Sequence, residues 1–289
     1  MDKNVSWKQR LKYYSKKENI GKISNKTLRE IIGQTIYKSK DFHKIKLYND
    51  LPFIISSKDK GLSLDLFVFK IREKSACKYF LSILNKNDIV FDLGANIGYY
   101  VIQEAKIVKK VIAIEPSKNS FELLKKNIHL NNLNNVEYYN IAIGDKNKLI
   151  DFYVYECANV SSVKPLEQHG DYKIEKTKMV KGKGFFKSYN NYPTVLRMDV
   201  EGYELEILKS FKDDLKFFKK FFFEVHTVFL GKQGVIELLG LVEQNGFDEI
   251  GFMNDDKYTG KIEPIKYFAI KDFKEYDFPE CFHLFGVKK

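Results

Sequence analysis

The chain has 289 residues, of which 44% are hydrophobic, 15% aromatic and 30% charged, and its net charge is +11. So much apolar and aromatic material excludes a disordered chain, and the length allows one large domain or one domain with an extension. No apolar run reaches the roughly 18 residues that cross a bilayer and no secretory signal begins the chain, so we expect a cytoplasmic protein without a transmembrane segment.

Residues 1–84 form a predicted accessory segment that is basic at its start. Residues 1–46 contain 13 Lys and Arg against 4 Asp and Glu, a net of +9. Such a segment can attract phosphates, nucleic acid or an anionic surface, but we favour a solvated helical face because no nucleic-acid module is recognisable. Periodicity predicts helices within residues 1–50, followed by a β-hairpin that pairs Phe53-Ile54-Ile55 with the apolar run 64–69.

A catalytic domain is predicted over residues 85–289, where strands and helices alternate from Asp88 onwards. Alternation of this kind indicates a parallel sheet covered by helices on both faces, which is an α/β Rossmann-like fold. An insertion around residues 148–193 interrupts the alternation, and we expect it to shape the substrate pocket. The predicted strands span residues 89–93, 111–114, 136–143, 194–200, 220–226, 248–253 and 282–287.

The segment Val90 to Gly98 joins a strand to a helix through a glycine-rich turn. Glycines let a backbone approach a ligand closely, and the helix that follows presents free N–H groups. The next strand ends in Ile114-Glu115-Pro116, which puts a carboxylate 23 residues after Asp92, where a ribose diol would lie. The two spacings together predict a nucleoside site.

The turn differs from the fingerprints of two common nucleotide classes. It lacks the Gly-x-Gly-x-x-Gly pattern, and Asp92 before the turn would repel a pyrophosphate. The chain also contains no Gly-x-x-x-x-Gly-Lys-Ser/Thr loop for a triphosphate. An acidic residue at this place suits the ammonium group of S-adenosylmethionine, which we therefore predict as the cofactor.

These segments resemble the FkbM-type methyltransferase family over about residues 88–226. The resemblance implies a class I methyltransferase with a mostly parallel seven-stranded sheet, its last strand antiparallel, that methylates hydroxyls of sugars, glycans or other small molecules. The chain departs from the family at Gly184-Phe185-Phe186-Lys187, where a Leu-Asp pair is usual. The segments that carry the resemblance are Phe91 to Gly98, Ile114-Glu115-Pro116-Ser117, Ala142-Ile143-Gly144-Asp145, Arg197-Met198-Asp199-Val200-Glu201-Gly202-Tyr203-Glu204 and Phe223-Glu224-Val225-His226.

The residues expected around the cofactor follow three successive strands. Glu115 is expected to accept hydrogen bonds from the ribose hydroxyls. Asn140 and Ala142 are expected to touch adenine, although a turn that only closes the sheet explains these two residues equally well. The amino-acid end of the cofactor is expected beside Asp92, Gly94, Ala95, Asn96 and Gly98.

Methyl transfer from a sulfonium is an in-line displacement, so the protein mainly aligns the acceptor oxygen and manages its proton. Asp199 and Glu201 end the fourth predicted strand, and Glu224 and His226 end the fifth, at the edge where ligands bind. His226 is the predicted base because its ordinary pKa lies near working pH. A core histidine bonded to the backbone stays open for His226, as does a helix-capping role for Glu201.

The same four residues have ligand types that also suit a divalent metal, which we do not favour at this point. Cys77, Cys157 and Cys281 are odd in number and have no Cys-x-x-Cys spacing, which predicts free thiols. Two rival functions stay open: an RNA ribose methyltransferase that holds RNA with the basic N-terminal arm, and a non-catalytic protein that binds S-adenosylmethionine. The chain has no Asn-Pro-Pro-Tyr or Asp-Pro-Pro-Tyr motif, which argues against methylation of base amino groups. The sequence leaves the oligomeric state open.

Overall fold

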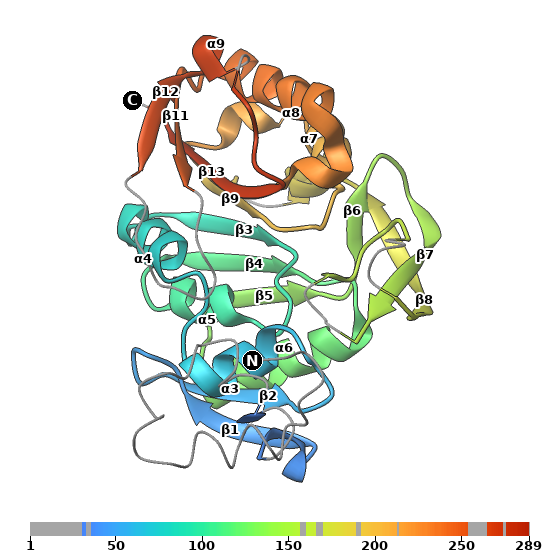
Figure 1. Cartoon of the computed structure of the whole chain (residues 1–289). Helices are drawn as coiled ribbons and strands as arrows, with labels where there is room; N and C mark the ends of the chain where they lie inside the picture. The colour runs from blue at the N-terminus through green and yellow to red at the C-terminus, as the bar shows by residue number, and fades with distance from the viewer. Residues whose placement is uncertain are drawn as a thin grey trace, which may run out of the picture.

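The computed structural model describes residues 31–32, 36–156, 160–165, 170–188, 192–212, 214–253, 265–273 and 276–288 (Figure 1). Its centre is an eight-stranded sheet with the order β12-β11-β13-β10-β9-β3-β4-β5. The strands are β3 (Ile89–Leu93), β4 (Lys110–Ile114), β5 (Val136–Tyr139), β9 (Val195–Met198), β10 (Lys220–His226), β11 (Glu249–Met253), β12 (Lys266–Ala269) and β13 (Cys281–Val287).

The predicted α/β fold with a mostly parallel sheet is confirmed. The five strands from β5 to β10 run parallel, and β13 lies antiparallel between β10 and β11. The sheet has eight strands where seven were predicted, because β12 adds an antiparallel edge beside β11. Only four residues long, β12 has no fully buried residue, so it lacks the apolar run by which the other strands were found.

Helices cover both faces of the large sheet, because successive strand residues point to opposite sides. Val90, Val111 and Phe222 pack into one core with α4 (Lys74–Ile83), α5 (Tyr99–Ala105) and α6 (Lys118–Leu130). Their neighbours Phe91, Ile112 and Phe223 pack into a second core with α7 (Glu204–Ser210), α8 (Thr227–Gln244) and α9 (Ile270–Phe273). Each such Val or Phe stabilises the fold by roughly 1.5–3 kcal/mol. Two short 3₁₀ helices, η5 (Phe185–Ser188) and η6 (Leu215–Phe217), also contribute to the second core.

On the first of these faces the strands change from apolar to ionisable towards their carboxyl ends. Val90 is followed two residues later by Asp92, Val195 by Arg197, and Phe222 by Glu224, and all six side chains are buried. Residues two apart on a strand share a face, so these charged groups gather beneath one edge of the sheet. This edge is where ligands bind in open α/β folds.

The N-terminal part folds differently from the prediction. β2 (Pro52–Ser56) does form half of a hairpin, but its antiparallel partner is β1 (Phe42–Lys46), where a helix was predicted. The run 64–69 belongs to a helix, α3 (Leu62–Phe69), so its assignment as a strand was wrong.

The reason lies in the residues before α3. Both carboxylate oxygens of Asp59 accept hydrogen bonds, each 2.8 Å long, from the N–H groups of Gly61 and Ser63 at the start of the helix. Free N–H groups of a first helical turn need such partners. Most of the predicted N-terminal helical region lies outside the described residues; within the described part, η2 (Tyr37–Ser39) precedes β1.

A second, three-stranded sheet lies beyond the carboxyl ends of β3, β4 and β5 (Figure 1). It consists of β6 (Ala142–Gly144), β7 (Lys148–Tyr155) and β8 (Tyr172–Lys181), with β8 in the middle. The predicted third strand over 136–143 was therefore too long: the chain leaves the large sheet after Tyr139 and joins the small one at Ala142. The predicted insertion supplies β7 and β8.

Candidate active site

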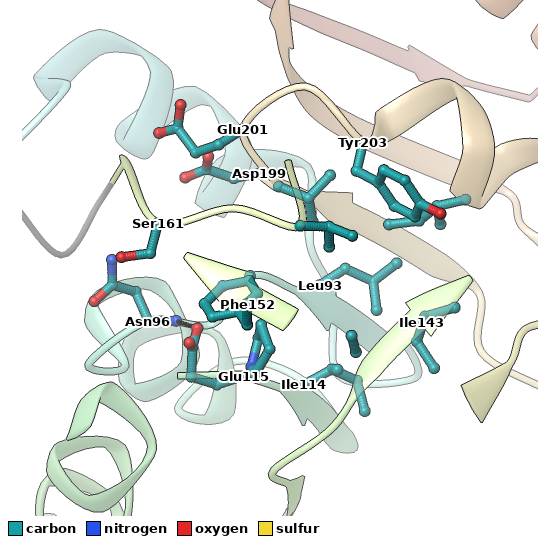
Figure 2. Close-up of a pocket in the computed structure, with 16 residues that line it drawn as sticks. Leu93, Asn96, Ile114, Glu115, Ile143, Phe152, Ser161, Asp199, Glu201 and Tyr203 are labelled. Atoms are coloured by element: carbon teal, nitrogen blue, oxygen red, sulfur yellow. Dashed lines mark hydrogen bonds between the residues drawn. The ribbon is translucent and has the colours of Figure 1, made fainter. Parts of the chain in front are cut away.

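A cavity opens between the eight-stranded sheet and the three-stranded sheet. The turn after β3 and the end of β4 form one wall, and the segment after β9 forms the opposite wall (Figure 2). The small sheet and the segment that follows β7 add a third wall. The residues that line the cavity as a whole include Gly94, Asn96, Glu115, Ala142, Phe152, Ser161, Asp199, Glu201 and Tyr203.

Gly94 lines this cavity at a backbone conformation with φ of 81°. A Cβ added here would lie 1.8 Å from the carbonyl oxygen of Asp199, far inside any real contact. The close approach of β3 and β9 therefore depends on glycine. A side chain at this position would disturb the fold itself as well as a ligand, so a Gly94→Val variant cannot separate cofactor binding from folding.

Asn96 and Gly98 complete the turn in different ways. Asn96 lines the cavity at a φ of 49°, and its side-chain oxygen accepts a hydrogen bond from the N–H of Ile97. Gly98 is not part of the lining: it begins α5 with a φ of 91°, and a Cβ there would meet Leu124 of α6 at 2.8 Å. Ala95 is buried in the core beside α5. Of the predicted turn residues, Gly94 and Asn96 thus face the cavity, whereas Ala95 and Gly98 support the turn.

Glu115 is the buried carboxylate of the cavity. Its two oxygens accept hydrogen bonds from the N–H of Ser117 at 2.7 Å and the N–H of Asn96 at 2.8 Å. Burial raises the pKa of Glu115 to about 7. The two N–H groups lower this pKa, whereas the nearby charges of Asp92 and Glu175 raise it further. The carboxylate is held rigidly and is ready to accept further hydrogen bonds from a hydroxylated ligand.

Of the two residues predicted at the adenine edge, the cavity includes one. Ala142 lines it at the start of β6. Asn140 lies outside the lining and donates hydrogen bonds from its side-chain nitrogen to the carbonyl oxygens of Glu115 at 2.9 Å and Pro116 at 3.0 Å. Asn140 therefore fixes the turn that carries Glu115.

Asp92 does not line the cavity, contrary to its predicted position at the ammonium group of the cofactor. It is fully buried, and one of its oxygens lies 2.7 Å from the Arg197 guanidinium. The guanidinium also stacks on the Tyr100 ring, with 4.0 Å to its centroid. Burial raises the pKa of Asp92 and the Arg197 charge opposes that rise. Since its charge is matched inside the protein, Asp92 ties β3 to β9.

Asp199 and Glu201 reach the cavity from the segment that follows β9 (Figure 2). Asp199 lies 3.3 Å from the second guanidinium nitrogen of Arg197. Burial and the neighbouring carboxylates of Glu224 and Glu201 raise the pKa of Asp199 well above its usual range. Glu201 has a φ of 50°, an unusual conformation of the kind that concentrates at functional sites.

His226 is placed differently from the predicted base. It lies outside the cavity lining, and its Nδ1 is 2.8 Å from Glu204, while its Nε2 is 3.2 Å from Glu201. Burial lowers the pKa of His226, but Glu201, Cys281 and Glu204 together raise it well above its ordinary value. A ring engaged at both nitrogens is a poor acceptor for a substrate proton, so the assignment of His226 as the base is not supported. Glu224 is likewise buried outside the lining, 3.9 Å from His226 Nε2.

Several site residues were missed at the sequence level. Arg197 could have been found, since its strand alternates Val195, Arg197 and Asp199 on one face and a buried arginine needs an acid opposite. Phe152 and Ser161 come from the insertion, where no pattern marked individual residues. Cys77 and Cys281 form no disulfide bond among the described residues, and Cys157 lies outside them.

Comparison with known families decides the class of the protein. A model of the methyltransferase FkbM domain matches residues 92–250, more than half of the chain. The chain belongs to the FkbM methyltransferase family. Gly94, Asn96 and Glu115, which the sequence predicts at the S-adenosylmethionine site, all lie within the segment of this FkbM protein that the model matches.

Curated relatives match the FkbM protein over short segments. An uncharacterized protein, MJ1452, from Methanocaldococcus jannaschii is 40% identical over 55 residues, which are 19% of this chain and 21% of that protein. The tRNA(Phe) (4-demethylwyosine(37)-C(7)) aminocarboxypropyltransferase of the same organism is 46% identical over 56 residues, 19% of this chain and 22% of its own. The chain thus matches about a fifth of the length of these relatives.

Solved structures resemble the FkbM protein over most of its length. Methyltransferase FkbM from Methylobacillus flagellatus KT has a TM-score of 0.45 and 13% identity over 77% of this chain and 52% of that one. M. jannaschii TYW2 in complex with AdoMet has a TM-score of 0.47 and 18% identity over 87% of each chain. A putative transferase, PH0793, from Pyrococcus horikoshii has a TM-score of 0.48 and 14% identity over 94% of this chain and 86% of that one. At these identities the likeness concerns the fold alone.

Among the helices described for the FkbM protein, none is both long and apolar enough to cross a membrane.

Proposed function

We propose that the FkbM protein transfers the methyl group of S-adenosylmethionine to a hydroxyl of a sugar, a glycan or another small molecule. The observation that carries this proposal is the arrangement of carboxylates in the cavity: Glu115 lies on one wall, and Asp199 and Glu201 lie on the opposite wall (Figure 2). A cofactor and a polar acceptor need two such walls, close enough for an in-line displacement.

The cofactor wall fits a nucleoside. Glu115 holds its carboxylate at the end of β4 with oxygens that can accept hydrogen bonds from both hydroxyls of a ribose. Gly94 contributes only backbone to this wall, and Leu93, Ile114 and Ile143 provide an apolar surface for a base. When bound there, S-adenosylmethionine supplies an electrophilic methyl group on a sulfonium.

On the acceptor wall, Asp199 is the proposed base. It lines the cavity directly, and Arg197 holds one of its oxygens at 3.3 Å, which fixes the orientation of the carboxylate. The acceptor oxygen forms a bond to the methyl carbon as the sulfur–carbon bond breaks, and the electron pair stays on sulfur. The hydroxyl proton passes to Asp199, and S-adenosylhomocysteine leaves. Glu201, held by His226, is proposed to orient the acceptor by a hydrogen bond.

Activity assays with the purified chain test the proposal. S-adenosylhomocysteine release is measured with S-adenosylmethionine and a panel of sugars, glycans and RNA. Asp199→Asn should lower kcat about 10²–10⁴-fold and leave S-adenosylhomocysteine affinity unchanged. Asp50→Asn is the matched control, because Asp50 is exposed and its φ of 63° suits asparagine.

Each outcome separates the candidate functions. Methylation of sugars or glycans supports the proposal, and salt-sensitive methylation of RNA ribose would replace it with the RNA alternative. Cofactor binding without turnover on any acceptor would favour a binding protein. Full activity of Asp199→Asn would refute its role as the base. We retain the cytoplasm as the proposed location, which fractionation of expressing cells can test.

A further inference from the structure

We propose that the FkbM protein binds one zinc-type divalent cation through His226, Glu224 and Cys281, with Glu201 as the fourth ligand on the cavity side. The site lies at the carboxyl end of β10, behind the acidic wall of the cavity. Of its four ligands, only Glu201 also has a role in methyl transfer as proposed above.

Strand pairing alone brings the ligands together. Glu224 and His226 are two residues apart on β10 and therefore share a face. β10 and β13 pair antiparallel, and His226 lies directly opposite Cys281 in their register. Side chains at opposite positions of such a pair are neighbours. A nitrogen, a sulfur and a carboxylate oxygen thus meet on one small patch of the sheet.

The distances among His226, Glu224 and Cys281 suit three ligands of one zinc ion, and Glu201 lies beside His226. The Nε2 atom of His226 lies 3.2 Å from Glu201 Oε2 and 3.9 Å from Glu224 Oε1, and Cys281 Sγ lies 3.1 Å from Glu224 Oε1. The ligand atoms of His226, Glu224 and Cys281 all lie within 4.8 Å of one another. Tetrahedral zinc with bonds of 2.0–2.3 Å separates its ligand atoms by about 3.3–3.7 Å. Small side-chain movements would therefore complete the coordination.

A fixed histidine tautomer is the second, independent observation. Glu204 is completely buried at the start of α7, and its carboxylate lies 2.8 Å from His226 Nδ1. A carboxylate on one nitrogen of a histidine fixes the ring and directs the other nitrogen to a metal, an arrangement typical of protein metal sites. The other Glu204 oxygen is buried without a hydrogen-bond partner among the described residues.

A neighbouring group of possible ligands fits less well. Glu73, Glu224 and His283 also converge, with His283 Nε2 3.5 Å from Glu73. The Arg72 guanidinium lies 2.7 Å from the Glu73 carboxylate. A metal ion bound to Glu73 would therefore be repelled by the positive charge of Arg72. The cluster on His226 also includes Glu201, which reaches the cavity and gives a metal a path of entry.

Only the placement of the metal beside the acceptor rests on the proposed function; metal binding does not. Bound there, the cation would lie beside Asp199 and would favour the ionised form of an acceptor hydroxyl that approaches it.

Cobalt(II) titration of chelator-treated protein tests the inference. We expect one Co²⁺ per chain, with visible bands of a tetrahedral site and a near-ultraviolet thiolate-to-cobalt band, and displacement by Zn²⁺. Cys281→Ser should remove the thiolate band, whereas Cys77→Ser, at a buried cysteine of α4 outside the cluster, should keep it. Glu204→Gln should weaken Co²⁺ binding about 10–100-fold while it leaves the thiolate band in saturated protein.

S-adenosylhomocysteine binding by the same samples keeps the two proposals apart. Protein that binds S-adenosylhomocysteine but no Co²⁺ or Zn²⁺ would overturn the metal site and leave the proposed function intact. A thiolate band that survives in Cys281→Ser would equally overturn it. One Co²⁺ bound by protein that methylates no acceptor would support the metal site and count against the proposed function.

Discussion

The raised pKa of Glu115 predicts that nucleoside affinity depends on pH. A carboxylate accepts hydrogen bonds from two ribose hydroxyls, whereas its protonated form has lost part of that capacity. With a pKa of about 7, Glu115 is about 1% ionised at pH 5 and about 90% ionised at pH 8. If only the ionised form binds, affinity should rise about 90-fold over this interval and level off above pH 8.

Calorimetry with 5′-methylthioadenosine measures this directly, because the ligand has the ribose diol but no amino-acid group that titrates nearby. Glu115→Gln should bind weakly and show a flat profile. Glu175→Gln is the matched variant: its charge contributes to the raised pKa of Glu115, so its removal should move the profile to lower pH without abolishing binding. A wild-type affinity that stays constant from pH 5 to pH 8 would refute the assignment of Glu115 to the ribose.

Three further predictions concern the free energy of unfolding. Gly94→Ala should lower it by several kcal/mol in thermal unfolding, because the new Cβ would meet the Asp199 carbonyl oxygen at 1.8 Å. Gly170→Ala is the control, with a φ of 78° but nothing within 4 Å of the new Cβ, and should lower it by about 1–2 kcal/mol; equal losses would contradict the argument. Arg197→Met should cost about 3–5 kcal/mol in urea unfolding by leaving a buried acid unpaired, and a loss below 1 kcal/mol would contradict it. The ligand-free protein should lose about 3 kcal/mol through Glu115 between pH 4.5 and pH 7, because the folded carboxyl keeps a proton that the unfolded one releases; Glu115→Gln should flatten that part of the profile.

The sequence predicted the fold well where periodic patterns are long, and it failed where a short segment depends on a distant partner. The strands β3, β4 and β10 were found by their apolar runs. The exposed edge strand β12 has no such run, and the helix α3 depends on capping by Asp59, which the apolar pattern of 64–69 does not reveal.

For the site, spacing along the chain predicted which edge of the sheet binds ligands, and Gly94, Glu115 and Asp199 meet there. The spacing could not predict that Asp92 and His226 pair with other side chains of the protein and lie outside the cavity lining. Asp92 is matched by Arg197, 105 residues away, and His226 by Glu204, 22 residues away. Partners of buried charges follow from strand order and register, and these are long-range properties of the fold.

The central claim is that Glu115 and Asp199 face the two ends of one methyl-transfer site. A crystal structure of the protein with S-adenosylhomocysteine tests it most directly. We expect both ribose hydroxyls within hydrogen-bond distance of the Glu115 carboxylate and the sulfur turned towards Asp199 and Glu201. A ligand bound outside this cavity, or one whose sulfur points away from Asp199, would contradict the account.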